Sequence, residues 1–234
     1  MLRLYVPGGP GADGSLRIAG AELRHLHTLR LGPGDRLRVF DDAGAEHEVA
    51  LDRVTAREAV ARVVATTHSR RESALELVLA PALLKQDKMD WVVEKATELG
   101  VTRIAPILTR YVVGRGSAVE RWRRLAVAAA KQSGRTRIPT VDAPAPLSAV
   151  LAGAWPGLRL VAWEDEAAVR VRDLPATTAA VVVVIGPEGG LHQDEVDAAR
   201  AAGFTTITFG RRVLRAETAA VAAVVLCQHR WGDG

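Results

Sequence analysis

Residues 181–191 read VVVVIGPEGGL, in which five branched apolar residues run directly into a turn of glycine, proline and glutamate. Short continuous apolar runs of this kind are typical of strands buried on both faces of a parallel sheet. In open α/β sheets, ligands bind beyond the carboxyl ends of the strands, and glycines there let a ligand approach the backbone. The stretch predicts a central strand whose end carries a ligand site, although the loop alone would also fit a tight turn.

A second stretch, residues 205–219, has the same design. It reads TTITFGRRVLRAETA: a strand, a glycine turn, three arginines and the start of a helix. Arginine beside the positive end of a helix is unfavourable unless its guanidinium faces an anionic partner. After the first loop, by contrast, Asp194 and Glu195 occupy the helix start that a phosphate would use. The first loop therefore favours a neutral or zwitterionic small molecule, held by backbone groups.

The chain as a whole divides into two parts. Up to about residue 68, short alternating strands and turn residues predict a small β-barrel or sandwich, with one helix at 21–30. The polar stretch 68–73 ends this rhythm. Beyond it, strands and helices alternate, and the near-continuous apolar strands predict a parallel sheet covered on both faces. We expect an α/β protein with domains at 1–70 and 73–234.

Charge is unevenly distributed along the 234 residues, although the formal net charge is only +4. Residues 85–137 hold 12 basic and 5 acidic side chains, which suggests either a polyanion such as RNA as partner or an ordinary solvated helix face. The chain has one cysteine, Cys227, in an apolar helical run. A single cysteine excludes an intramolecular disulfide and a zinc site built on several cysteines. We expect Cys227 to be a small buried residue.

The sequence lacks the motifs that mark several functional classes. No phosphate-binding GxxxxGK[ST] motif occurs, and the six histidines show no metal-ligand spacing, so we expect no metal. No apolar run approaches the roughly 18 residues of a membrane helix. We therefore expect no membrane partner and a cytoplasmic location.

Five stretches, in this order, resemble one family. They are RHLHTLRLGPGDRLRVFD (24–41), KMDWVVEKATELGV (88–101), AAAKQSGRTRIP (128–139), VVIGPEGGL (183–191) and GRRVLRAETA (210–219). Together they resemble the ribosomal RNA small subunit methyltransferase E (RsmE) family of the SPOUT methyltransferase superfamily, over nearly the whole chain. One departure is alanine at position 216, where the family pattern has threonine, which would remove a hydroxyl group near the cofactor.

The resemblance implies a fold and an activity. The fold would be an N-terminal PUA-like β-barrel (1–70) that binds RNA, and a C-terminal SPOUT α/β domain (73–234) with a trefoil knot, which binds S-adenosylmethionine and forms a homodimer. The reaction would be methylation of N3 of one uridine in the decoding region of 16S ribosomal RNA, with the small ribosomal subunit as the partner. No metal is implied.

The resemblance also implies roles for individual residues. The expected cofactor contacts are Ile185, Gly186, Gly190, Phe209, Gly210, Val213, Leu214 and Thr218. The expected catalytic residues are Arg215 as anion stabiliser, with Glu188 and Glu217 orienting the base or taking its proton. The expected RNA contacts are Arg24, Arg30, Lys131, Arg135 and Arg137. Glu217 would serve equally well as an ordinary acidic residue at a helix start.

Two other functions fit parts of the sequence. One is a SPOUT enzyme that acts on transfer RNA instead of ribosomal RNA. The other is a non-catalytic RNA-binding or ribosome-assembly factor that keeps the fold without binding the cofactor.

Overall fold

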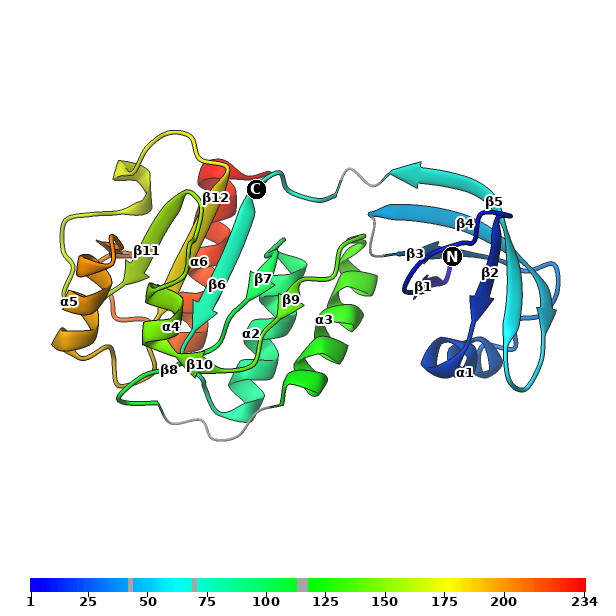
Figure 1. Ribbon diagram of the computed structural model, residues 1–234, viewed down its shortest axis with the longest axis horizontal. Coiled ribbons are helices and arrows are strands. Elements are labelled where there is room, and N and C mark those ends of the chain that lie inside the picture. The colour runs from blue at the N-terminus through cyan, green and yellow to red at the C-terminus, as the bar shows by residue number, and fades with distance from the viewer. Residues whose placement is uncertain (42–43, 69–70, 113–117) are drawn as a thin grey trace. The chain divides into compact units, whose positions relative to one another are not determined.

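The computed structural model describes residues 1–41, 44–68, 71–112 and 118–234, which form two compact units (Figure 1). The first unit comprises Met1–Glu72 together with Ala130–Ile138, and the second comprises Ser73–Ala129 and Pro139–Gly234. The polar stretch 68–73, where the sequence changes rhythm, lies partly outside the described residues. The chain thus returns to the first unit for nine residues after much of the second has been built.

The first unit is built on one five-stranded sheet with the strand order β1-β3-β4-β5-β2. Its strands are β1 Arg3–Tyr5, β2 Ser15–Ile18, β3 Arg36–Phe40, β4 Ala45–Val54 and β5 Ala59–His68. All its pairings are antiparallel except that of β1 with β3. Alternate residues such as Leu37 and Val39 are buried, and helix α1 (Gly20–Thr28) adds Leu23 and Leu26 to the same core.

Ion pairs hold the segment Ala130–Ile138 within the first unit. Arg135 is only 3% exposed, and its Nη2 donates to Glu72 at 2.8 Å. Lys131 Nζ lies 2.8 Å from Glu22 on α1, and Arg3 on β1 donates to the carbonyl of Ala130. Because such buried or half-buried pairs are costly to break, the segment is a structural part of this unit.

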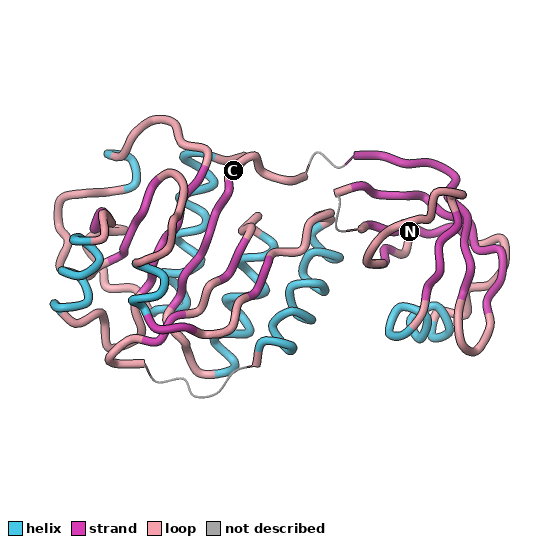
Figure 2. Tube along the Cα trace, in the orientation of Figure 1, coloured by secondary structure: helices cyan, strands magenta, loops and turns pink. Residues whose placement is uncertain are grey.

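The second unit contains a six-stranded parallel sheet with the order β13-β11-β12-β6-β7-β9, which confirms the expected α/β architecture (Figure 2). Its strands are β6 Glu76–Pro81, β7 Arg103–Ile104, β9 Thr140–Val141, β11 Leu158–Ala162, β12 Ala180–Ile185 and β13 Thr205–Ile207. Strand β12 is buried along its whole length, and Val183 lies opposite Leu79 of β6 and Leu160 of β11.

One apolar run of the sequence forms two short strands. The run RIAPILT (103–109) forms β7 and then a separate strand, β8 (Ile107–Leu108), which pairs with β10 (Ala145–Pro146) outside the main sheet. Pro106 stands between them and has no N–H to continue the ladder, which explains the break.

Helices cover both faces of the parallel sheet. They are α2 Gln86–Glu98, α3 Val119–Ser133, α4 Leu147–Leu151, α5 Gln193–Ala201 and α6 Ala216–Trp231, with a short 3-10 helix, η1, at Val171–Asp173. Helix α6 packs against β6, β12 and α2, while α5 contacts β13 and α4 (Figure 1). Cys227 on α6 is fully buried, and burial raises the pKa of its thiol to about 12, so it is the inert small residue predicted.

Among the described residues, no helix combines the length and the apolar character needed to span a membrane.

Candidate functional site

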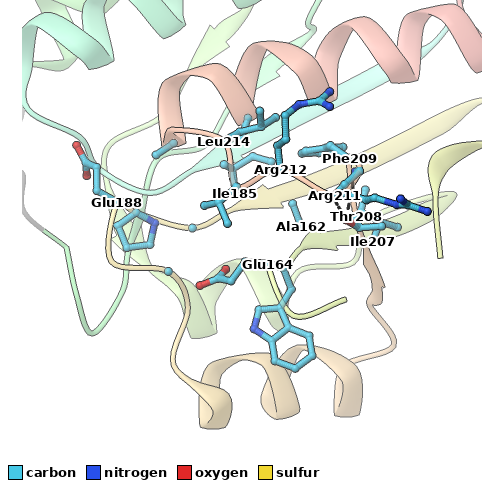
Figure 3. Close-up of a pocket in the computed structure, with 18 residues that line it drawn as sticks. Ala162, Glu164, Ile185, Glu188, Ile207, Thr208, Phe209, Arg211, Arg212 and Leu214 are labelled. Carbon is cyan, nitrogen blue, oxygen red and sulfur yellow. Dashed lines mark hydrogen bonds between the residues drawn. The ribbon is translucent and has the colours of Figure 1, made fainter. Parts of the chain in front are cut away.

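Three parallel strands end side by side and open a pocket at one edge of the sheet (Figure 3). Strands β11, β12 and β13 end at Ala162, Ile185 and Ile207, and the loops that follow them form the pocket walls. The pocket is an open cleft of about 710 Å³, a volume that includes the solvent at its mouth. Gly186 and Gly210, both expected to contact the cofactor, line this one pocket.

Most of the residues expected to contact a cofactor line this pocket. They are Ile185, Gly186, Gly190, Phe209, Gly210, Val213 and Leu214. Thr218 does not line it and is exposed on α6. Ala216, the departure from the family pattern, is buried and contributes to the wall.

Sequence analysis missed the third wall of the pocket. Ala162, Trp163 and Glu164, at the end of β11, line it together with Ile207 and Thr208 of the third strand end. The available signal was the apolar run LRLVAW (158–163), whose carboxyl end must share an edge with its parallel neighbours. That run lacks glycines, so it carries no local signal of a turn that a ligand could approach.

Backbone conformation makes glycine necessary at two points of the pocket. Gly190 has φ +74°, and a Cβ there would overlap the carboxylate of Glu164. Gly210 has φ +127°, a conformation that side chains with a Cβ rarely adopt. The walls therefore present bare peptide groups, and Ile185, Ile207 and Leu214 add apolar side chains to them. Such a pocket suits a flat apolar ring system with polar edges.

A cluster of three charges lies beside the pocket. Lys88 Nζ on α2 is 3.0 Å from Glu188 Oε1 in the GPEGG loop and 3.2 Å from Glu217 Oε2 on α6. Burial is the largest single influence on Glu188 and acts to raise its pKa. The hydrogen bond from Lys88, a backbone hydrogen bond and the charges of Lys88 and Lys85 together outweigh it, so the pKa lies below its usual value. Glu188 is thus ionised near neutral pH and is a weak proton acceptor. Lys88 was not among the predicted site residues.

Arg215 is exposed at the N-cap of α6, between the lining residues Leu214 and Ala216. It does not itself line the pocket, and within the described chain its guanidinium makes no hydrogen bond or ion pair. Glu217, in the first turn of the same helix, is committed to Lys88. Of the three expected catalytic residues, only Glu188 lines the pocket.

The residues expected to bind RNA fall into two groups, all within the first unit. Arg24, Arg30 and Arg137 are exposed. Arg30, with φ +56°, is the single non-glycine residue with positive φ in the described part of the chain, and such conformations cluster at functional sites. For Arg135 the expectation needs correction, because its buried guanidinium is held by Glu72. Lys131 is likewise engaged, by Glu22.

Comparison with known proteins first shows the general class of protein to which this chain belongs. Residues 71–228, most of the chain, match the RNA methyltransferase domain family. The parallel α/β unit, with its pocket at the strand ends, is therefore an RNA methyltransferase domain.

Individual relatives narrow the class. Ribosomal RNA small subunit methyltransferase E from Mesomycoplasma hyopneumoniae is 30% identical over 90% of this chain and 92% of its own length. The enzyme of that name from Synechocystis is 31% identical over 95% of this chain and 75% of its own. The crystal structure of the Neisseria gonorrhoeae enzyme bound to S-adenosyl methionine has a TM-score of 0.92 at 31% identity, over 100% of this chain and 99% of that one. The chain belongs to the ribosomal RNA small subunit methyltransferase E family.

Proposed function

We propose that this protein transfers a methyl group from S-adenosylmethionine to N3 of one uridine in the decoding region of 16S ribosomal RNA. The observation that carries the proposal is the convergence of three strand-end loops on one pocket, in a chain of this family. The solved relative that binds S-adenosyl methionine matches this chain over its whole length, which supports the same cofactor here. A ribosomal substrate would place the protein in the cytoplasm.

The pocket residues fit such a cofactor. The apolar walls from Ile185, Ile207 and Leu214 suit an adenine ring, and the bare backbone at Gly186 and Gly210 suits recognition of its polar edge. When bound, the cofactor would supply an activated methyl group. The protein would have to position the acceptor nitrogen and deal with its proton.

The finer features of the fold follow from the same family. Strand β13 comes after β12 in the chain but pairs with β11, and the loop after β13 returns to the pocket formed by the other two loops. This path supports a trefoil knot in the region that follows β11. The five-stranded first unit is consistent with a PUA-like barrel that contacts RNA.

Catalysis would depend on the charges at the pocket mouth. N3 of uridine is a poor nucleophile while it carries its proton, so a group must stabilise the anion that remains once the proton leaves. We propose Arg215 for this role, because its guanidinium has no partner within the described residues and its neighbours Leu214 and Ala216 line the pocket. Glu188 and Glu217, both bound to Lys88, would orient the base, because a carboxylate with a lowered pKa such as Glu188 accepts protons poorly.

A second copy of the chain would complete the molecule. Trp91 on α2, Val213 in the pocket lining and Val225 on α6 are large apolar residues that are 43%, 84% and 44% exposed. Such residues on a packed α/β unit are typical of an interface that another chain covers. We therefore propose a homodimer that buries these residues.

Methylation at N3 can be read directly from cellular RNA, because it blocks the Watson–Crick face. We expect reverse transcriptase to stop at one uridine of 16S RNA from cells that carry the gene and to read through in a deletion strain. Complementation with the Arg215→Ala variant should also give read-through. A stop in the deletion strain, or none in the parent, would reject the proposed reaction.

A companion assay separates the rival substrates. Purified protein should transfer methyl groups from S-adenosylmethionine to small subunits or 16S RNA lacking the modification. Transfer to transfer RNA alone would favour the related tRNA enzymes, and a protein that binds no S-adenosylmethionine would be a non-catalytic factor.

We expect the affinity for RNA to fall as the salt concentration rises, and we expect the exposed arginines in α1 and just after it to contribute to this dependence. For the double variant Arg24→Ala/Arg30→Ala, we expect weaker binding to 16S RNA. We also expect a plot of log affinity against log salt whose slope is shallower by about 1 to 2, since each lost phosphate contact removes roughly 0.7 to 0.9. The measurement is filter binding across a salt series.

A matched control is the double variant Arg36→Ala/Arg38→Ala on β3. These arginines are also exposed, but their guanidiniums already pair with carboxylates, so the salt slope should stay within experimental error of the parent. Equal slopes for all three proteins would show that the residues of α1 do not contact RNA.

A further inference from the structure

Glu164 is an acidic residue of the pocket with no assigned role. It follows Trp163 directly after β11 and lines the pocket. Figure 3 shows its carboxylate pointing toward the side of the GPEGG loop, away from the guanidiniums of Arg211 and Arg212. It lies so close to Gly190 that any Cβ at that position would overlap its oxygens.

The carboxylate of Glu164 has no charged partner among the residues that the structure describes. Two acidic residues line the pocket, Glu164 and Glu188, and Glu188 is neutralised by Lys88. Across the described residues, the Glu164 carboxylate makes no hydrogen bond and no ion pair. Its oxygens are thus available to a ligand in the pocket.

The loop that carries Glu164 is held in place by other groups. The N–H of Trp163 donates to the carbonyl of Ile207 at 3.1 Å, and Arg200 stacks 4.9 Å from the Trp163 ring. Glu166 accepts hydrogen bonds from Thr206 Oγ1 at 2.6 Å and from two backbone N–H groups of its own loop. A fixed backbone on either side means that Glu164 is presented without a large ordering cost, as expected of a binding residue.

The surroundings of Glu164 indicate which chemical group it would bind. It is exposed, so its charge stays solvated, and a screened ion pair to a sulfonium or ammonium group would contribute little. Hydrogen bonds to a carboxylate are local and keep their strength, and its two oxygens can accept from two neighbouring hydroxyls. Acidic residues at the strand ends of α/β folds bind ribose hydroxyls in this way.

We propose that Glu164 binds the vicinal hydroxyls of the cofactor's ribose and thereby sets the position of the nucleoside in the pocket. The inference rests on the proposed function, because it takes an adenosine-containing cofactor as the ligand. Glu164 is a binding and positioning residue in this role, and it takes no part in proton transfer.

Calorimetry with two cofactor forms tests the assignment. S-adenosylmethionine carries a sulfonium charge, whereas S-adenosylhomocysteine does not, and both carry the same ribose. We expect Glu164→Ala to weaken binding of both ligands equally, by about 10- to 100-fold, as for the loss of hydrogen bonds to a charged group. Glu164→Gln, which keeps one acceptor oxygen, should lose less.

A 2′-deoxy analogue of S-adenosylhomocysteine completes the comparison. The parent protein should bind it more weakly than S-adenosylhomocysteine, and Glu164→Ala should cost much less affinity for this analogue than for the ribose form. The matched control is Asp165→Ala, which removes an exposed neighbouring carboxylate that does not line the pocket and should leave every affinity unchanged. Thermal unfolding of each variant checks that the fold is intact.

Three results would overturn the inference. A loss confined to S-adenosylmethionine would assign Glu164 to the sulfonium, and unchanged affinities in Glu164→Ala would remove it from the site. A parent protein that binds neither cofactor form would reject the proposed function itself, and with it this inference.

Discussion

Replacement of Arg215 by alanine is expected to lower the turnover number by about 100- to 1,000-fold, the range seen when one stabiliser of a developing anion is removed. Affinity for S-adenosylmethionine should stay within about twofold, because Arg215 does not line the pocket and has no partner within the described residues to lose. Single-turnover methyl transfer measures the first quantity, and calorimetry measures the second.

The control for Arg215 is Arg124→Ala. Arg124 is exposed on α3, makes no ion pair among the described residues and lies outside the pocket lining, so its removal changes net charge equally. If Arg215→Ala turned over at the parental rate, or if both variants lost turnover alike, Arg215 would have no specific part in the reaction.

Gly157, just before β11, is the position where a single methyl group should most damage the second unit. Its φ is +70°, and a Cβ would overlap the carbonyl oxygen of Ala180, the first residue of β12. We expect Gly157→Ala to lower the free energy of unfolding by about 2 to 4 kcal/mol, from about 1 kcal/mol of backbone strain and about 1 to 3 of overpacking. Ala180 belongs to the ladder that aligns the pocket loops, so cofactor affinity should fall as well.

Gly203 offers a matched comparison in the same unit. Its φ is +82°, but the nearest atom to an added Cβ is an arginine nitrogen at 3.9 Å, so Gly203→Ala should cost only the strain, about 1 kcal/mol. Urea unfolding followed by tryptophan fluorescence suits this test, because all five tryptophans lie in the second unit. Equal losses in the two variants would show that overlap of the added Cβ with the Ala180 carbonyl does not destabilise the second unit.

Local patterns in the sequence were sufficient for the architecture of the second unit. The run at 181–185 is typical of a strand buried on both faces, and the family resemblance implied that the loops at Gly186 and Gly210 contact one cofactor. The end of β7 before Pro106 could also have been predicted, because proline has no N–H for a strand ladder. The short strands around it depend on pairing with distant residues, which no local pattern encodes.

The partners of individual side chains could not be predicted from the sequence. Arg135 lies in a basic stretch, as RNA-binding arginines often do. In the folded chain it is buried against Glu72, 63 residues earlier in the sequence. Lys88 gains its importance from Glu188 and Glu217, which come from two other elements. Long-range charge pairing of this kind has no period or spacing, and only the folded chain reveals it.

The return of Ala130–Ile138 to the first unit has a consequence for biosynthesis. A nascent chain that has emerged only as far as Glu72 lacks the partners of Glu22 and Glu72, namely Lys131 and Arg135. The amino-terminal unit can therefore reach its final form only after Ile138 has left the ribosomal exit tunnel, when part of the second unit has already been translated. Proteolytic or genetic excision of residues 1–72 should yield an incomplete fragment.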